Sequence, residues 1–439
     1  MQETESIRVG ICGLGTVGGG TLELLRANRL EISDRLGKEV VVSHVATRTL
    51  KPELTQDIAT IGTDPLAVAS DPNVDILVET IGGCDIAFEL IATALAKGKQ
   101  VVTANKALIA ERGNELFVLA EKHRVNLAFE SSVGGGIPVI RALREGLAAN
   151  EIQWLAGIIN GTGNFILTEM AEKQREFSEV LKQAQKLGYA EADPAFDVEG
   201  IDAAHKLTIM ASIVFGIPLQ FDKVYMEGIS HITPHDISYA DELGYCIKHL
   251  GIAQRSERGM ELRVHPTLLS RSRLLASVNG VGNAVLVNGN RVGSTLYYGP
   301  GAGAEATASS VVADIIDIAR QQAAGAVEPV CPALGYRNYS NKLPVLTIED
   351  IESEYYLRIP AMDRLGVMAR ISSVLQSQSI NIEAVIQKES SSKNVPIVIL
   401  THKVKERNLN QALATLEALE EVTGSITRIR VESFHSGTA

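Results

Sequence analysis

The chain has 439 residues, a length that predicts about three domains of roughly 150 residues each. Its 41 Lys and Arg residues face 52 Asp and Glu residues, so its formal net charge is −11. This acidic balance argues against nucleic-acid binding, which leaves a basic footprint. No apolar run approaches the ~18 residues that a membrane helix needs. We therefore expect a globular protein that has neither nucleic acid nor membrane among its partners.

Four cysteines, Cys12, Cys84, Cys246 and Cys331, stand far apart in the sequence and form no CxxC pair. Neither a zinc ribbon nor a redox dithiol is expected from such spacing. The first ten residues carry two acids and no apolar stretch, whereas a secretory signal needs a basic start and an apolar segment. Reduced thiols and this N-terminus predict a cytoplasmic protein.

Residues 1–135 alternate short apolar runs with helix-length segments such as 23–37 and 87–99. This alternation implies parallel strands joined by right-handed crossovers, hence an α/β, doubly wound, Rossmann-type sheet. The expected strands are 7–13, 40–46, 75–80, 99–105 and 125–130. An amphipathic helix within 303–325 is expected to return to this domain.

A change of pattern after residue 135 predicts a larger α+β domain over 136–302. Its expected helices are 171–188 and 201–216, and its expected strands are 151–159, 261–269, 273–278 and 282–287. A proline-containing linker is expected over 326–353. Residues 354–432 then follow the order β-α-β-β-α-β, which is typical of the ferredoxin-like fold.

A G-x-G-x-x-G turn, Gly13 to Gly18, directly follows the first strand and opens a helix. Gly13 allows the tight turn, Gly15 lets the backbone approach a pyrophosphate, and Gly18 lets the helix pack on the strand. The amides of the helix start, at Thr16 and Val17, can meet phosphate charge. A dinucleotide site is the favoured interpretation, with a merely tight turn as the alternative.

Three further strand ends should face the ligand crevice of such a sheet. Arg48 follows the second strand, where an arginine suits the 2′-phosphate of NADP(H); a solvated surface arginine, with NAD(H) as cofactor, is the alternative. Thr80 and Lys106 follow the next two buried strands. A lysine directly after a buried parallel strand favours a functional role over random surface charge.

The densest chemistry lies between residues 184 and 206, where a loop carries several carboxylates. Asp202 opens a helix and Lys206 follows it at i+4, so both side chains share one face. The alternative is an exposed helix pair of little energetic value. The apolar run after Lys206 instead indicates a buried helix, and a lysine in a low-dielectric site can serve as an acid or base.

The segment 184–206 resembles the signature of the homoserine dehydrogenase family. The matching positions are Ala184, Gly188, Asp193, Pro194, Asp197, Gly200, Asp202 and Lys206. The motifs GLGTVG, VTANK, FESSVGGGIP, NGTGNFIL and YYGPGAG extend the resemblance over about the first 325 residues. It implies the reversible, NADP(H)-dependent reduction of L-aspartate 4-semialdehyde to L-homoserine in threonine, methionine and isoleucine biosynthesis. It also implies that 136–302 is the catalytic and dimerisation domain.

The resemblance implies a role for each matching residue. Lys206 would donate a proton to the carbonyl oxygen, and Lys106 would share in polarising it. Glu191 and Asp202 would hold the substrate α-ammonium, and Asp197 would support the geometry of the site. Two positive charges close together repel each other, so one of the two lysines would lose its proton more readily, which suits acid–base catalysis near neutrality.

The resemblance also implies backbone contacts of Gly188 and Gly303 with the cofactor. It further implies a monovalent cation, sodium, at the turn after the fifth expected strand, where hard oxygen donors suit such an ion. A glycine-rich hinge is the alternative there. The ligands would be Glu130 and the main-chain oxygens of Val133, Gly135 and Ile137.

Residues 354–432 resemble an ACT domain, a small regulatory module that binds amino acids. Asp363 to Gly366 matches its D-x-x-G turn, and Asn381 and Ile382 start the next strand, where effectors of the family bind. The resemblance implies threonine as effector and pairing of modules into a homodimer or homotetramer. A purely structural dimerisation module is the alternative.

Two other functions remain open at this point. One is a related amino-acid dehydrogenase on the same scaffold, which differs only in its aldehyde. The other is a nucleotide-sensing regulator without turnover, against which Lys206, Asp202 and Glu191 argue because they match a catalytic signature.

Overall fold

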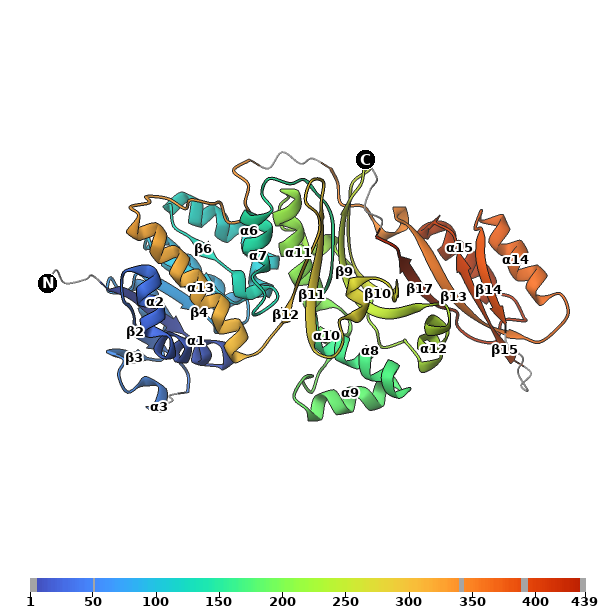
Figure 1. Ribbon diagram of the computed structural model, residues 1–439, viewed down its shortest axis with the longest axis horizontal. Helices are drawn as coiled ribbons and strands as arrows, with labels where there is room; N and C mark the ends of the chain where they lie inside the picture. Colours follow the sequence, from blue (N-terminus) through green and yellow to red (C-terminus); the bar gives the residue numbers. More distant parts are fainter. Residues whose placement is uncertain (1–5, 50–51, 339–342, 388–393, 435–439) are drawn as a thin grey trace. The chain divides into compact units, whose positions relative to one another are not determined.

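The computed structural model describes residues 6–49, 52–338, 343–387 and 394–434. The chain divides into two compact units (Figure 1). The first takes residues 1–153, 205–222 and 282–342, and the second takes 154–204, 223–281 and 343–439. This division differs from the three expected domains because contacts join segments that lie far apart in the sequence.

The first unit is built on a six-stranded parallel sheet in the order β3-β2-β1-β4-β5-β6. This order is that of a doubly wound Rossmann sheet, as the sequence predicts. Only the short β3 was not expected. The strands are β1 (Ile7–Cys12), β2 (Val40–Ala46), β3 (Thr60–Gly62), β4 (Ile76–Glu79), β5 (Gln100–Thr103) and β6 (Leu127–Ala128).

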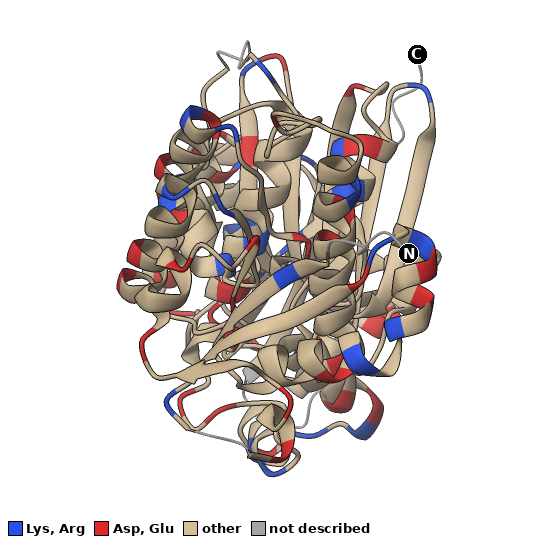
Figure 2. Cartoon of the chain, turned by 90° about the vertical axis from the view of Figure 1, so that its left-hand side faces the viewer, with Lys and Arg blue, Asp and Glu red and all other residues tan. Residues whose placement is uncertain are grey.

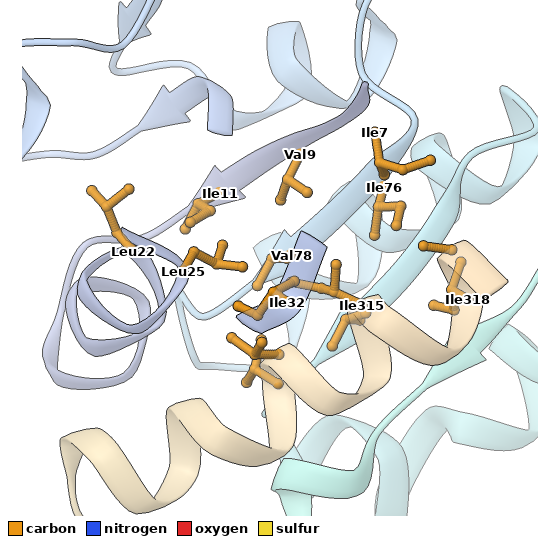
Figure 3. Close-up of a cluster of buried hydrophobic side chains, with 14 of the residues drawn as sticks. Ile7, Val9, Ile11, Leu22, Leu25, Ile32, Ile76, Val78, Ile315 and Ile318 are labelled. Atoms are coloured by element: carbon orange, nitrogen blue, oxygen red, sulfur yellow. The ribbon is translucent and has the colours of Figure 1, made fainter. Parts of the chain in front are cut away.

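Helices α1 (Thr16–Ala27) and α13 (Ala304–Ala323) close the core of this sheet. Figure 3 shows Ile315 and Ile318 of α13 in one apolar cluster with Val9 and Ile11 of β1. The helix at the end of the unit's sequence thus packs on the strand at its beginning. The unit's other helices are α2 (Arg29–Leu36), α3 (Pro52–Thr55), α4 (Pro65–Ser70), α5 (Asp85–Ala96), α6 (Lys106–His123) and α7 (Val139–Arg141).

The first unit also contains an antiparallel hairpin, β11 (Gly282–Gly289) and β12 (Gly293–Pro300). The segment 23–37 is helical as expected, except that Asn28 interrupts it and separates α1 from α2. On the side seen in Figure 2, Lys and Arg alternate with Asp and Glu along the helices.

The second unit holds a mixed sheet in the order β7-β9-β10-β17-β13-β15-β14. Its last four strands carry α14 (Val367–Ser377) and α15 (Glu406–Glu417) and form the expected ferredoxin-like module. β10 pairs in parallel with β17, so the module continues the sheet. The strands are β7 (Ile152–Ile158), β9 (Tyr245–Arg255), β10 (Met260–Ser270), β13 (Glu352–Met362), β14 (Ile382–Gln387), β15 (Asn394–Thr401) and β17 (Thr427–Glu432).

Two expectations for this unit are wrong. The helix expected over 171–188 is two helices, α8 (Gly161–Lys173) and α9 (Phe177–Lys186), because Gln174 takes φ 51° and ends the first. The strand expected over 273–278 is a 3-10 turn, Leu274–Ser277. The second unit also contains α10 (Ala195–Val198) and α12 (Pro234–Glu242). Helix α11 (Ile201–Phe215) begins in this unit and continues into the first unit from residue 205.

The four cysteines are free thiols, as expected. Among the described residues, no helix combines the length and apolar character that crossing a membrane requires.

Candidate active site

The three glycines of the nucleotide turn have three different surroundings. A Cβ on Gly18 would lie 1.9 Å from the oxygen of Gly13, and Gly13 itself has φ +97°. A Cβ on Gly15 would meet nothing within 4 Å. The Thr80 hydroxyl donates to the Gly13 oxygen at 2.8 Å and so holds the turn. The open space is therefore at Gly15, the N-cap of α1, where a pyrophosphate needs access to backbone amides.

A second helix begins near the first helix of this unit. Gly303, with φ +120°, is the N-cap of α13. A Cβ on Gly20 would lie 2.8 Å from the Ala304 oxygen, so α1 and the start of α13 are in close backbone contact. This contact explains a glycine within α1 that costs about 1 kcal/mol of helix propensity. Two helix N-termini of the same unit thus add their positive ends, which favours an anionic ligand.

The ends of β2, β4 and β5 carry the other expected cofactor residues. Arg48 is exposed directly after β2. Glu79 is fully buried and accepts hydrogen bonds from the amides of Ile81 and Gly82, which fixes the loop around Thr80. Burial raises the pKa of the Glu79 carboxyl.

Lys106 is the half-buried first residue of α6, whose N-cap is Asn105. A cation at the positive end of a helix dipole is unfavourable by about 0.3–1 kcal/mol. Helix stability therefore gives no reason for a lysine here, and a ligand with negative charge or a polarised carbonyl would supply one.

Helix α11 carries Asp202 and Lys206 one turn apart. Asp202 is 3 % exposed and Lys206 is 8 % exposed. These values rule out the alternative of a solvated surface pair, whose value falls with screening by water. Charged groups are buried only when they are paired or hydrogen-bonded, so this helix presents two charges in a shielded environment.

A residue that the sequence analysis did not single out joins two of the acids. The Asn160 amide nitrogen lies 2.8 Å from Asp197 Oδ1 and 2.8 Å from Asp202 Oδ2. Asn160 is also the N-cap of α8. It is the first residue of the motif NGTGNFIL, which signalled the segment but gave Asn160 no role.

The remaining residues of this region that are expected to contact substrate or cofactor lie on the loop between α9 and α10. Gly188, with φ +76°, follows the end of α9. Glu191 is exposed, and its main-chain oxygen accepts a hydrogen bond from Gln185 at 3.1 Å. The loop therefore has a fixed backbone at Glu191 and leaves that carboxylate accessible.

The turn expected to bind a cation has fixed main-chain oxygens. The Gly135 oxygen accepts from the Ser310 hydroxyl at 2.6 Å, and the Ile137 oxygen accepts from Val139 N–H at 2.7 Å. Each carbonyl keeps a second lone pair for a cation. The Glu130 carboxylate accepts backbone amides from Ile140 and Arg141, each at 2.8 Å, and each of its oxygens likewise keeps a lone pair for a cation.

The residues expected to bind an effector lie on the C-terminal module. Gly366, with φ +88°, is the N-cap of α14, and the preceding Leu365 is fully exposed. Asn381 is exposed just before β14, and its main-chain oxygen accepts from His402 N–H at 2.9 Å. Ile382 begins β14 and is half-buried. An αL glycine before a helix and a neighbouring strand start thus occur as the ACT resemblance predicts.

Comparisons with known proteins agree with this arrangement. The family model "Homoserine dehydrogenase" matches residues 138–316, "Homoserine dehydrogenase, NAD binding domain" matches 13–130, and "ACT domain" matches 355–421. Homoserine dehydrogenase of Pseudomonas aeruginosa is 57 % identical over 432 residues, which cover 98 % of this chain and 99 % of that protein.

Solved structures give the same result. A homoserine dehydrogenase from Thiobacillus denitrificans is 53 % identical and superposes with a TM-score of 0.94 over 98 % of this chain and 99 % of that one. A hyperthermophilic archaeal homoserine dehydrogenase mutant in complex with NADPH is 28 % identical, with a TM-score of 0.61 over 72 % of this chain and 98 % of that one. The chain belongs to the homoserine dehydrogenase family of oxidoreductases, with an NAD-binding domain and an ACT domain.

Proposed function

We propose that this protein catalyses the NADP(H)-dependent, reversible reduction of L-aspartate 4-semialdehyde to L-homoserine, in threonine, methionine and isoleucine biosynthesis. The observation that carries the proposal is the buried pair Asp202 and Lys206, one turn apart on α11. A carboxylate and a lysine in this relation can bind the ammonium group of an amino-acid substrate and exchange a proton with its carbonyl oxygen.

Each side chain has a task in this reaction. NADPH, when bound, supplies the hydride that adds to the aldehyde carbon. Lys206 donates the proton that the carbonyl oxygen takes up, and receives it back when homoserine is oxidised. Lys106 shares in polarising this oxygen, and Asp197 supports the geometry of the site. Glu191 and Asp202 hold the α-ammonium, which orients the aldehyde relative to Lys206.

NADP(H) is the preferred cofactor and NAD(H) the alternative. The exposed guanidinium of Arg48, directly after β2, suits the 2′-phosphate that distinguishes the two. The NADPH complex of the archaeal relative supports this choice. The open space at Gly15, the turn held by Thr80 and the helix start at Gly303 would receive the pyrophosphate.

A sodium ion is proposed at the turn after β6. Its ligands would be Glu130 and the main-chain oxygens of Val133, Gly135 and Ile137. No group of three or more His, Cys, Asp or Glu residues within the described ranges could hold a metal, so carbonyl oxygens are the relevant donors.

Threonine is proposed as a feedback inhibitor that binds the ACT domain at Gly366, Asn381 and Ile382. The sheet of the second unit supports such coupling because β17 pairs directly with β10. Arg430 of β17 is completely buried and donates to Glu227 at 2.8 Å.

The chain after Glu227 continues this connection towards the acidic loop. Ile229 N–H donates to the Val198 oxygen at 3.0 Å, and Ser230 donates to Glu199 at 3.2 Å. Val198 follows Asp197 directly. A displacement of β17 by an effector would therefore be passed from Glu227 along the backbone to Ile229, and from there to the loop that carries the substrate-binding carboxylates.

We further propose that the protein is cytoplasmic and forms a homodimer or homotetramer. Each chain would contain the three domains that the sequence predicts.

A steady-state assay with aspartate semialdehyde tests the function. NADPH oxidation should exceed NADH oxidation, and millimolar threonine should lower the rate. Lys206→Ala should abolish turnover with little change in NADPH affinity. Absence of turnover with this aldehyde, combined with tight NADPH binding, would favour the nucleotide-sensing regulator, and a higher rate with another amino-acid aldehyde would favour a related dehydrogenase.

A further inference from the structure

We propose that Asn160 is a positioning residue that holds Asp197 and Asp202 together and so places Asp202 to bind the α-ammonium group of the substrate. It thereby sets the preference of the site for a substrate with an α-amino group. The inference rests on the proposed function, because that function supplies the ammonium group.

The orientation of the Asn160 amide is fixed by the helix that it caps. Its Oδ1 accepts the Gly163 N–H at 2.7 Å. The reverse orientation would set the NH₂ group against this N–H, so oxygen and nitrogen are assigned by the hydrogen bonds. The two amide hydrogens must therefore point away from α8, and each meets a carboxylate, of Asp197 or Asp202, at 2.8 Å. Asn160 is 6 % exposed, so little water competes for these bonds.

The chain reaches this arrangement by a tight turn between α10 and α11. Gly200 has φ +88°, and a Cβ there would lie 2.9 Å from Val264 and 3.2 Å from His249. The turn thus admits no larger residue without displacement. It brings Asp197, near the end of α10, and Asp202, in the first turn of α11, to the same amide nitrogen.

A neutral amide has a specific electrostatic effect between two acids. The bonded oxygens of Asp197 and Asp202 can be no farther apart than twice the 2.8 Å bond length. Like charges at this separation repel. The two N–H dipoles of Asn160 offset part of this repulsion. Two carboxylates held together in this way suit the ammonium group that the proposed substrate carries.

Two variants separate positioning from helix capping. Asn160→Ser keeps a good N-cap but removes both amide donors, whereas Asn160→Ala removes the cap as well. Both should lower kcat/KM for aspartate semialdehyde about 10- to 100-fold, mainly through KM, with the KM for NADPH unchanged. Asn160→Ala alone should also lower the Tm.

A deaminated substrate gives the decisive comparison. Succinate semialdehyde has the same carbon chain without the α-amino group. Wild-type protein should favour aspartate semialdehyde over it, and Asn160→Ser should reduce this preference about 10-fold or more while kcat/KM for the analogue stays constant. Thr233→Ala is the matched control, since it removes the cap of α12 in the same unit and should lower the Tm without altering the preference.

The outcomes distinguish the two proposals. If wild-type protein does not oxidise NADPH with aspartate semialdehyde, the proposed function fails. If wild-type protein is active and Asn160→Ser retains its substrate preference, the positioning role is overturned. Loss of activity in Asn160→Ala but not in Asn160→Ser would also overturn it, because Asn160 would then act only as a helix cap.

Discussion

Gly15 and Gly18 should respond in opposite ways to the same added methyl group. Gly18→Ala places a Cβ 1.9 Å from the backbone oxygen of Gly13, so the turn or the helix must shift, at a cost of at least about 3 kcal/mol. Gly15→Ala meets no atom within 4 Å, and its φ of −70° is open to alanine. The loss of a glycine N-cap and the lower entropy of the unfolded chain roughly offset each other, so the stability of Gly15→Ala should change by less than about 1 kcal/mol.

The binding effect of Gly15→Ala should be large despite the small effect on folding. Its methyl group would occupy the space that a phosphate oxygen needs to reach the helix-start amides. Loss of one charge-assisted hydrogen bond costs about 1.5–3 kcal/mol, which corresponds to a roughly 10- to 100-fold rise in Kd.

A fluorescence titration with NADPH and a thermal unfolding scan measure the two effects on the same samples. Gly146→Ala is the control, since a Cβ there also meets nothing within 4 Å but lies outside the turn. Wild-type NADPH affinity in Gly15→Ala would show that the phosphate binds elsewhere. A Gly18→Ala protein as stable as wild type would contradict the steric argument.

Three further predictions concern charge. Arg430→Met removes the closest cation of the buried Glu406 and the half-buried Glu227, which keep Arg428 as a cation. It should cost up to about 3–5 kcal/mol, or up to roughly 10 °C in Tm, whereas the exposed control Arg35→Met should cost less than about 0.5 kcal/mol. Equal losses in a thermal scan would refute this difference. Burial, together with the charge of Glu130, raises the pKa of Asp314 to about 7. The folded protein then keeps a proton that the unfolded chain releases near pH 4, so stability falls as the pH rises from about 4 to 7. Asp314→Asn should reduce the slope of the free energy of unfolding against pH by up to about 1.4 kcal/mol per pH unit, as measured by urea unfolding. An unchanged slope would show that Asp314 does not cause the pH dependence. Arg48→Ala should lower kcat/KM with NADPH about 10- to 100-fold and leave kcat/KM with NADH unchanged. If the ratio of these two kcat/KM values does not change, Arg48 is a surface arginine without a role in cofactor choice.

Local patterns were sufficient for much of the fold. The apolar runs at β1, β2, β4 and β5 and the glycine turn after β1 are short-range signals, and the structure follows them closely. The errors arose where a pattern has two solutions. The run at 273–278 is apolar enough for a strand but forms a 3-10 turn, and the break at Gln174 depends on one αL residue inside a helical pattern.

The site shows the same limit at the level of single residues. The i+4 spacing of Asp202 and Lys206 was readable, because one helix carries both side chains. The motif NGTGNFIL contains Asn160, but its contacts with the two acids could not be predicted, since it lies 37 residues from Asp197 and 42 from Asp202 and meets them only in the folded chain.

By itself, the sequence determined the Rossmann sheet, the ferredoxin-like module and the acidic loop with its lysine, because residue spacing and propensity along the chain specify each of them. The return of α13 to the nucleotide domain was also predicted, and the structure shows it packed on β1. The tertiary structure decided that β17 pairs with β10 and that one amide joins two distant carboxylates. These are contacts between segments far apart in the chain, and their free energy depends on the burial and geometry of both partners, which no local pattern contains.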